Sequence, residues 1–408
     1  MSLIWLKIWS KQLMGKYNFD TVIDRHNTNS LKWDYAKRRN KPTDALPLWV
    51  ADMDFKCPKE VTDALVKKAN HAIFGYSEPL DSYYEVLENW FTKHYNWTPT
   101  RNKFILVPGV VFGICAVINA LTKEGDSIII NQPVYYPFSE SIRDNKRKLV
   151  VSNLVRDNDK YKIDYEDFEK KIIDNNVKLY ILCNPHNPVG RVWTYDELKK
   201  ISDICLKHNV FVISDEIHAD FVYKGYKFTS YATLGSDALN NAVICTAPSK
   251  TFNLAGLHNG NIYIENDSIR RRVRFEINKI GYSQSNIMGI VACEASYKYG
   301  EAWLKELLEY LEKNIEFVRE YLEIKIPKIK LIEPEGTYLI WLDCKELGLD
   351  DEKLNDLILN KAKLWLDEGN IFGEVGKFYE RINIACPKAT LKEALDRLYN
   401  ALREEGVI

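Results

Sequence analysis

The stretch Ala242-Val-Ile-Cys-Thr-Ala-Pro-Ser-Lys250-Thr-Phe-Asn-Leu-Ala-Gly256 decides the fold of this chain. Its apolar run, residues 242–245, ends in a threonine, an alanine and a proline. Short apolar runs bounded by turn residues predict buried parallel strands. Lys250 is then expected at the carboxyl end of a strand, the edge where open α/β sheets bind ligands. Because a lysine is costly to desolvate, its position there indicates chemistry on its amine.

Two strand ends earlier in the chain also carry polar side chains. The run LYILC at residues 179–183 leads to Asn187 in the loop NPHNPVG, and the run VFVIS at 210–214 leads to Asp215. An asparagine, an aspartate and a lysine at three successive strand ends are the side chains that a pyridoxal phosphate site needs. Lys250 would bind the cofactor covalently through its amine, and Asp215 would pair with the pyridinium nitrogen.

Several longer strings resemble one enzyme family. NPHNPVG at 184–190, SDEIH at 214–218 and SKTFNLAGL at 249–257 are similar to the aspartate-aminotransferase fold of pyridoxal-phosphate enzymes, also called fold type I. WVADMDF at 49–55 and PEGTYLIWLD at 334–343 are most similar to the MalY/PatB-like branch of cystathionine β-lyases and carbon–sulfur lyases. Together these strings identify the chain as a member of that branch by resemblance.

The resemblance extends from about Asn18 to the C-terminus and implies an α/β fold in two domains, which suits a chain of 408 residues. The large domain is expected to hold a mixed, mostly parallel seven-stranded sheet, and the smaller domain to be α+β. The expected divisions are a leader or extension at 1–13, an N-terminal segment of the small domain at 14–60, the large cofactor-binding domain at 61–300 and the small C-terminal domain at 301–408.

Composition and charge argue against several classes of partner. The chain has 56 basic and 57 acidic side chains, so no global field favours nucleic acid or a membrane surface. The eight cysteines lie far apart without a C-x-x-C pair, and we expect buried, reduced thiols of a cytoplasmic protein. Histidine and cysteine do not occur at metal-ligand spacing, so no metal site is expected.

The start of a helix is the expected site for the cofactor phosphate. The sequence predicts a strand at 104–107, a turn, and a helix at 110–121. Free amides in the first turn and the helix dipole attract anions. We therefore expect the backbone amides of Val110 and Val111 to form a phosphate cup near Lys250. The sequence contains no G-x-G-x-x-G, which argues against a dinucleotide.

Two further helices have strong local signals. Thr194 and Glu197 form a capping box that predicts a helix reaching about His208. From Glu301 to about Tyr321, apolar residues recur at i, i+3 and i+4. That spacing predicts a helix with one buried stripe, and we expect this helix to run from the large domain to the small one.

The resemblance assigns further residues to the cofactor. Tyr135 would stack on the pyridine ring, Asn187 would donate to its phenolate oxygen, and Ser249 would donate to the phosphate. His218 occupies the place where aminotransferases usually have a tyrosine bonded to the same oxygen, and histidine there is typical of the lyase branch. Tyr76 would reach the phosphate bound by the partner subunit, which implies a homodimer with a shared active site.

Two residues are expected to meet the substrate, a small amino acid. Arg381 lies inside the apolar strand pattern FYERINIACP at 378–387, and a buried arginine needs an anion. That anion is either a structural salt-bridge partner or, as the resemblance implies, the substrate α-carboxylate. The resemblance also places Ala51 near that carboxylate, although its segment could be a plain surface loop. His258, where many relatives keep arginine, would leave more of the phosphate binding to backbone amides.

The resemblance implies a homodimeric, pyridoxal-phosphate-dependent carbon–sulfur β-lyase of the cystathionine β-lyase type. Such an enzyme performs α,β-elimination on cysteine thioethers and releases a thiol, pyruvate and ammonia. An aminotransferase with the same residues is the first alternative, because no single residue separates the two reactions. A regulatory binding protein is the second, although the intact Lys250 favours catalysis.

Overall fold

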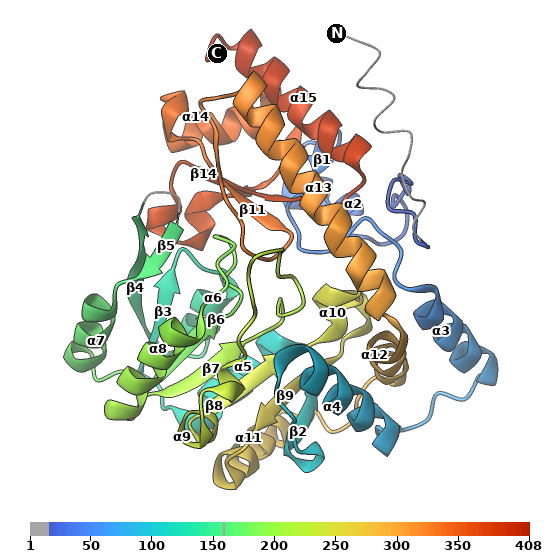
Figure 1. Cartoon of the computed structure of the whole chain (residues 1–408), viewed down its shortest axis with the longest axis vertical. Coiled ribbons are helices and arrows are strands. Elements are labelled where there is room, and N and C mark those ends of the chain that lie inside the picture. Colours follow the sequence, from blue (N-terminus) through green and yellow to red (C-terminus); the bar gives the residue numbers. More distant parts are fainter. Residues whose placement is uncertain (1–15, 158–159) are drawn as a thin grey trace.

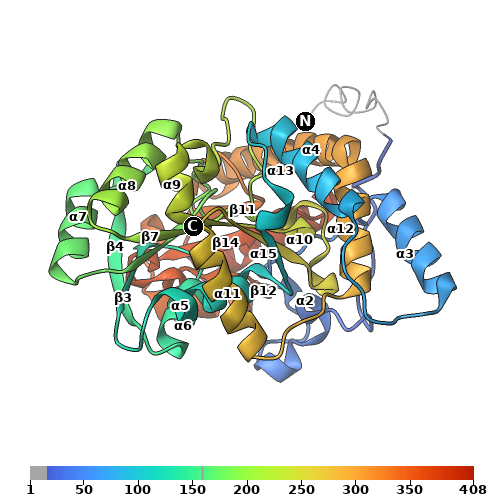
Figure 2. The same ribbon diagram turned by 90° about the horizontal axis from the view of Figure 1, so that it is seen from below.

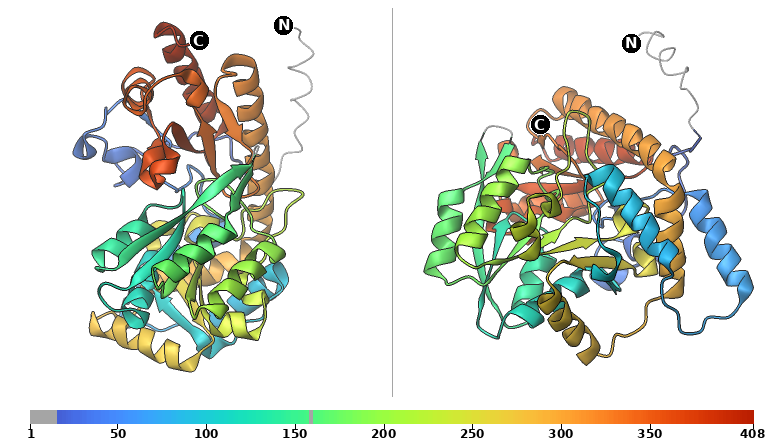
Figure 3. Two further views of the ribbon diagram at one scale, coloured as in Figure 1. Left: turned by 90° about the vertical axis from the view of Figure 1, so that its left-hand side faces the viewer. Right: turned by 60° about the horizontal axis from the view of Figure 1, so that its bottom comes forward.

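The computed structural model describes residues 16–157 and 160–408, so the expected leader at 1–13 lies outside the described residues. The described chain forms a large unit on an eight-stranded sheet and a smaller unit on a four-stranded sheet. Figures 1 and 3 show the smaller unit, in orange and red, lying above the large one, with the blue N-terminal segment beside it. The two units therefore face each other across a common boundary.

The large sheet is mixed and mostly parallel, as the resemblance implies. Its strands run in the order β2-β9-β8-β7-β6-β3-β4-β5, and every pair from β8 through β4 is parallel. Eight strands are present in the described residues instead of the expected seven, since β4 turns back into the antiparallel strand β5 at the edge. The strands are β2 (Phe104–Val107), β3 (Ser127–Gln132), β4 (Lys148–Asp157), β5 (Lys160–Ile163), β6 (Leu179–Cys183), β7 (Phe211–Asp215), β8 (Ala242–Thr246) and β9 (Gly260–Ile264).

Helices cover both faces of this sheet, so its strands are apolar on both sides. Within β3, Ile128 and Ile130 belong to one hydrophobic core and Ile129 to the other. One core includes α5 (Val110–Leu121), α6 (Pro137–Asp144) and α11 (Asp267–Lys279). The other includes α4 (Asp81–Tyr95), α7 (Tyr165–Asp174), α8 (Tyr195–Lys207) and α12 (Ile287–Tyr299). Figure 2 shows α7 and α8 at one edge of the molecule and α3 (Lys59–His71) at the other. The short helices α9 (Ser236–Asn240) and α10 (Pro248–Thr251) flank β8.

The local helix signals are confirmed. The backbone amide of Glu197 donates to Thr194 Oγ1 at 3.3 Å, and the amide of Thr194 donates to Glu197 Oε2 at 2.9 Å, which completes the capping box of α8. The helix expected from Glu301 is α13 (Glu301–Lys325), whose 25 residues extend over about 37 Å. It leaves the large unit beside α12 and passes along the small one (Figure 1).

The small unit has an antiparallel sheet in the order β10-β11-β14-β13. The N-terminal segment joins this unit through β1, which pairs in parallel with β12. Among residues 16–157 and 160–408, no helix is both long and apolar enough to cross a bilayer. The elements are β1 (Leu46–Pro47), β10 (Lys330–Ile332), β11 (Leu339–Asp343), β12 (Leu364–Trp365), β13 (Asp367–Glu368), β14 (Tyr379–Asn383), α2 (Leu31–Asp34), α14 (Asp351–Asp356) and α15 (Lys388–Glu404).

Candidate active site

A cavity of about 460 Å³ lies at the carboxyl ends of β6, β7 and β8. Its volume falls within the range of sites for small molecules and cofactors. Nine of the residues that were expected to hold the cofactor or the substrate line it: Ala51, Val110, Val111, Tyr135, Asn187, Asp215, His218, Ser249 and Lys250. Residues from six separate parts of the sequence thus meet at the sheet edge where ligands are expected.

Lys250 stands on α10, directly after β8, and its amine faces the loop at Ala51. Its Nζ donates a hydrogen bond of 2.8 Å to the carbonyl oxygen of Ala51. Burial lowers the pKa of Lys250 to about 8, and the positive charge of Arg381 lowers it further. The negative charges of Asp52 and Asp215 act in the opposite direction. An amine with this pKa has an appreciable neutral fraction near pH 7, which a nucleophile or a general base requires.

Asp215 ends β7 as a buried carboxyl group. Its Oδ1 accepts a hydrogen bond of 3.1 Å from the backbone amide of Ile217. Burial raises its pKa to about 7, against that hydrogen bond and the charge of Lys250. A buried carboxylate with so little compensation favours a cationic partner. The protonated nitrogen of a pyridine ring is such a partner.

His218 is buried beside the same cavity. Burial lowers its pKa to about 3, and the charges of Lys250 and Arg381 act in the same direction, so the imidazole is neutral at pH 7. Its Nδ1 is buried and has no hydrogen-bond partner among the described residues. Since buried polar atoms are nearly always paired, this orphaned atom fits a site whose remaining partner belongs to a bound group.

The N-terminus of α5 supplies the anion-binding part of the cavity. This helix has 12 residues, begins at Val110 directly after Gly109, and presents its free first-turn amides there. Ser249 lines the same cavity, as does His258, whose side chain is exposed. A helix N-terminus and a hydroxyl group in one cavity are suited to a phosphate.

Tyr135 and Asn187 lie next to each other at the cavity. The backbone amide of Tyr135 donates to the carbonyl oxygen of Asn187 at 3.0 Å, and burial raises the pKa of the Tyr135 phenol. The side-chain oxygen of Asn187 accepts a hydrogen bond from Arg381. With that oxygen occupied, the amide group of Asn187 retains its NH₂ as a donor, which a phenolate oxygen would need.

Arg381 lies just outside the residues that line the cavity and already has an anionic partner. It forms a buried ion pair with Asp367 and donates through Nη2 to the carbonyl oxygen of Trp49 at 2.7 Å. Its guanidinium also lies over the ring of Phe372, 4.8 Å from the centroid. The Nε of Arg381 is buried and unpartnered within the described chain. The structural salt bridge is therefore present, and the role of carboxylate anchor stays a prediction.

Tyr76 lies apart from the cavity in the single chain. Its side chain is 94% exposed and lines a groove of about 550 Å³ with Phe74 and residues 284–288. A residue so placed cannot contact a cofactor bound in its own subunit. Its predicted role requires a second copy of the chain.

Sequence reasoning missed several residues around the lysine. Tyr338 donates through its hydroxyl to the Ala51 carbonyl oxygen at 2.9 Å, and Asp52 is the carboxylate with the largest effect on the pKa of Lys250. Asp52 lies in the string at 49–55 and Tyr338 in the string at 334–343. A polar side chain among the apolar residues of each string was a signal that could have indicated these two residues. Asp367, the partner of Arg381, had no local signal because it is 14 residues away on another strand.

Comparison with known proteins gives consistent results. The model of the family "Aminotransferase class I and II" matches residues 43–398. The cystathionine β-lyase PatB of Bacillus subtilis is 39% identical over 94% of this chain and 100% of its own length. Cystalysin from Treponema denticola, whose crystal structure contains pyridoxal 5′-phosphate, superposes with a TM-score of 0.92 at 38% identity, covering 95% of this chain and 99% of its own. A C–S lyase from Staphylococcus hominis with bound pyridoxal phosphate gives a TM-score of 0.88 at 32% identity, with the same coverages.

Proposed function

The chain belongs to the class I and II aminotransferase family, and from this membership we propose that it is a pyridoxal-phosphate-dependent carbon–sulfur β-lyase acting on cysteine thioethers such as cystathionine. One observation carries the proposal. Lys250, Asp215 and His218 line one cavity together with the N-terminus of α5. A reactive amine, a buried carboxyl, a neutral imidazole and an anion site are the groups that this cofactor requires.

Each part of the cofactor has a candidate partner in the cavity. Lys250 would bind its aldehyde carbon, and Asp215 would pair with its ring nitrogen. The amides of Val110 and Val111 and the hydroxyl of Ser249 would hold the phosphate. Asn187 and His218 would contact the phenolate oxygen, and Tyr135 would cover the ring. When bound, the protonated ring supplies an electron sink for the negative charge that develops at the substrate Cα.

The chain's own residues then account for the elimination. Arg381 would bind the substrate α-carboxylate and orient the Cα–H bond. The substrate amine would displace Lys250 from the cofactor, and the freed Lys250 amine would then remove the α-proton. The Cβ–S bond breaks, and the thiolate leaves with the bonding electron pair. The three-carbon enamine that remains takes up water and yields pyruvate and ammonia. Cystathionine and one water thus give homocysteine, pyruvate and ammonia, with no net oxidation.

We further propose a homodimer that shares its active sites. The groove lined by Tyr76 carries exposed apolar side chains, with Phe74 60% and Tyr76 94% exposed. Burial of such a surface against a second copy would remove them from water and bring Tyr76 to the partner's phosphate. All eight cysteines are free, which suits a reducing cytoplasm, but Cys57 and Cys115 are only partly buried, so the expectation of buried thiols is wrong for these two.

An aminotransferase is the second candidate, since the matching family model is named for that activity. Lys250 and Asp215 would serve both reactions in the same roles. His218 and the lyase relatives favour elimination. The substrate is best defined by incubating the purified holoenzyme with cystathionine, cystine, S-methylcysteine and alanine while pyruvate is measured. Pyruvate from the three sulfur amino acids and none from alanine supports the proposal, and pyruvate from none of them contradicts it.

A further inference from the structure

The loop at residues 50–55 positions the amine of Lys250. The carbonyl oxygen of Ala51 accepts hydrogen bonds from Lys250 Nζ at 2.8 Å and from the Tyr338 hydroxyl at 2.9 Å. This carbonyl therefore defines where the unbound amine rests. Because a backbone carbonyl can turn only when its loop moves, the groups that hold the loop also determine the position of the amine.

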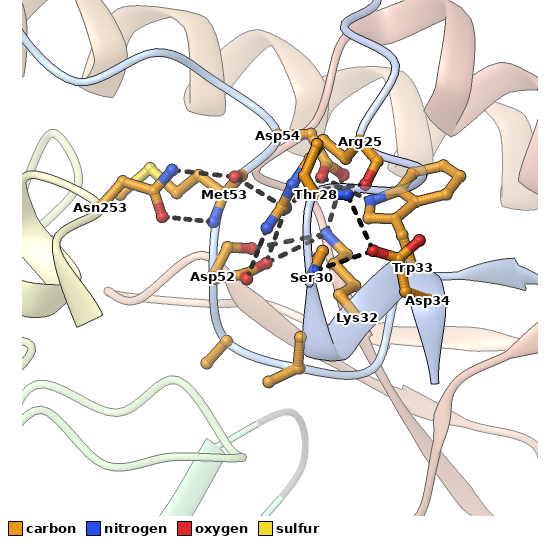
Figure 4. A network of polar contacts seen from close by, with 12 residues as sticks. Arg25, Thr28, Ser30, Lys32, Trp33, Asp34, Asp52, Met53, Asp54 and Asn253 are labelled. Atoms are coloured by element: carbon orange, nitrogen blue, oxygen red, sulfur yellow. Dashed lines mark hydrogen bonds and ion pairs between the residues drawn. The ribbon is translucent and has the colours of Figure 1, made fainter. Parts of the chain in front are cut away.

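A cluster of charged side chains holds one side of the loop (Figure 4). Arg25 donates to the carboxylate of Asp52 through Nη1 and Nη2, at 3.0 and 2.8 Å, and Nη1 also donates to the Met53 carbonyl oxygen at 3.2 Å. Lys32 has a fully buried side chain and forms an ion pair of 2.8 Å with Asp54. Arg25 reaches Asp54 as well, at 2.6 Å. Two cations therefore bind three consecutive residues of the loop.

The ion pairs of this cluster keep the Asp54 carboxylate charged and also restrict the loop to one geometry. Burial acts to raise the pKa of Asp54, yet Lys32 and Arg25 bring it below its ordinary value, so the carboxylate stays ionised. Buried ion pairs contribute little net stability compared with apolar residues of the same volume, and their best-attested use is to fix one geometry. The Arg25–Asp52 pair is only partly buried, and its two parallel hydrogen bonds make it directional. The cluster therefore suits a requirement for exact placement of the loop.

Asn383 holds the loop through two of its backbone carbonyl groups. Its Nδ2 donates to the carbonyl oxygens of Val50 at 2.8 Å and of Asp52 at 2.7 Å. These two carbonyls flank that of Ala51 in the sequence. With both flanking carbonyls held, a rotation of the Ala51 carbonyl has to be absorbed within the two dihedral angles beside it, which restricts this movement. Asn383 is on β14 of the small unit, whereas Arg25 belongs to the N-terminal segment.

We propose that Arg25 and Asn383 are positioning residues for Lys250, which hold the loop through its side chains and its backbone so that the Ala51 carbonyl oxygen stays against the amine. The inference rests on the proposed function only in taking Lys250 as the reacting amine. Asp52, Asp215 and Arg381 are the charged groups that act on this amine. The test therefore uses substitutions that preserve charge, Arg25→Lys and Asn383→Ser, so that a change reports on the position of the loop.

Reductive methylation of the full-length, cofactor-free protein measures the state of the amine directly. Only the neutral amine condenses with formaldehyde, and a borane reductant then fixes the methyl group, which mass spectrometry quantifies on the Lys250 peptide. A carbonyl that accepts from the amine favours its charged form. When the loop loosens, the neutral fraction rises, and we expect Lys250 to be modified about threefold faster at pH 7 in both variants.

The matched control is Arg319→Lys, which alters a two-bonded contact between Arg319 and Glu333 on the surface of α13. This variant should modify Lys250 at the wild-type rate. Wild-type rates in folded Arg25→Lys and Asn383→Ser would overturn the inference, and so would an equal acceleration in the control. If one of the two test variants does not fold, as judged by circular dichroism, the other decides. No cofactor or substrate takes part, so this outcome is independent of whether the protein is a lyase.

Discussion

Arg381 Nη1 donates a hydrogen bond of 3.1 Å to Asn187 Oδ1, although the two residues are 194 positions apart in the sequence. Arg381 belongs to β14 of the small unit, and Asn187 lies in the loop after β6 of the large sheet. The contact joins the predicted substrate anchor to a predicted cofactor ligand. Asp367 forms a buried ion pair with the same arginine. A substrate carboxylate would therefore bind to an arginine that its neighbours already hold in place.

Substitution of Arg381 should impair binding of the α-carboxylate. A charge-assisted pair is worth a few kcal/mol, so we expect Arg381→Ala to lower kcat/KM for cystathionine by about 100-fold or more. Steady-state assays on cystathionine and on its analogue that lacks the α-carboxylate of the cysteine half would separate a role in carboxylate binding from a structural role. The analogue should lose far less, because it has no carboxylate to bind.

Stability is the control for that prediction. Without Arg381, Asp367 would remain as a buried carboxylate without its cation. Breaking such a pair costs about 3–5 kcal/mol of unfolding free energy, which a denaturant titration would detect. Arg381→Lys keeps the charge and should recover most of the stability but less of the activity. Equal losses of activity on both substrates would assign Arg381 a structural role alone.

The stability of the cofactor-free protein should depend on pH through Asp215. Its pKa is about 7 in the folded chain, whereas an aspartate in water has an ordinary pKa of 3.8. The folded state therefore binds this proton more tightly than the unfolded state does. The contribution of Asp215 to stability is therefore present below pH 4 and is lost as the pH rises to 7. Asp215→Asn should stabilise the cofactor-free protein over wild type by on the order of 2 kcal/mol more at pH 8 than at pH 5. A difference that is the same at both pH values would contradict a buried, uncompensated carboxyl group.

Tyr76 should affect the cofactor without affecting the fold of its own chain. Tyr76→Phe removes one hydroxyl from a side chain that is 94% exposed, so the melting temperature of the cofactor-free variant should match that of the cofactor-free wild type. We expect it to lose the cofactor faster during dialysis, because the phosphate in the partner subunit loses a donor. Tyr195→Phe, at a tyrosine 48% exposed on α8, is the matched control and should retain the cofactor. An active protein that sediments as a monomer would refute the shared site.

Local sequence signals predicted much of the large unit and of the cavity. Strands such as β6 and β8 are continuous apolar runs that end in turn residues, so their carboxyl ends and Lys250 could be located directly. The partner of Arg381 could not, since Asp367 reaches it only through the antiparallel pairing of β13 with β14. The same is true of Arg25 and Asp52, which are 27 positions apart and meet only in the folded chain. Contacts set by packing between distant segments leave no periodic trace in the sequence.

The measurement that tests the central claim most directly is the turnover of cystathionine by the holoenzyme with no 2-oxo acid present. A lyase needs only the substrate and water, and we expect sustained release of homocysteine, pyruvate and ammonia in equal amounts over many turnovers. Lys250→Ala, which removes the amine that faces Ala51, should abolish this release. If the reaction instead stops after one equivalent per site and resumes only when 2-oxoglutarate is added, the protein is an aminotransferase and the account is wrong.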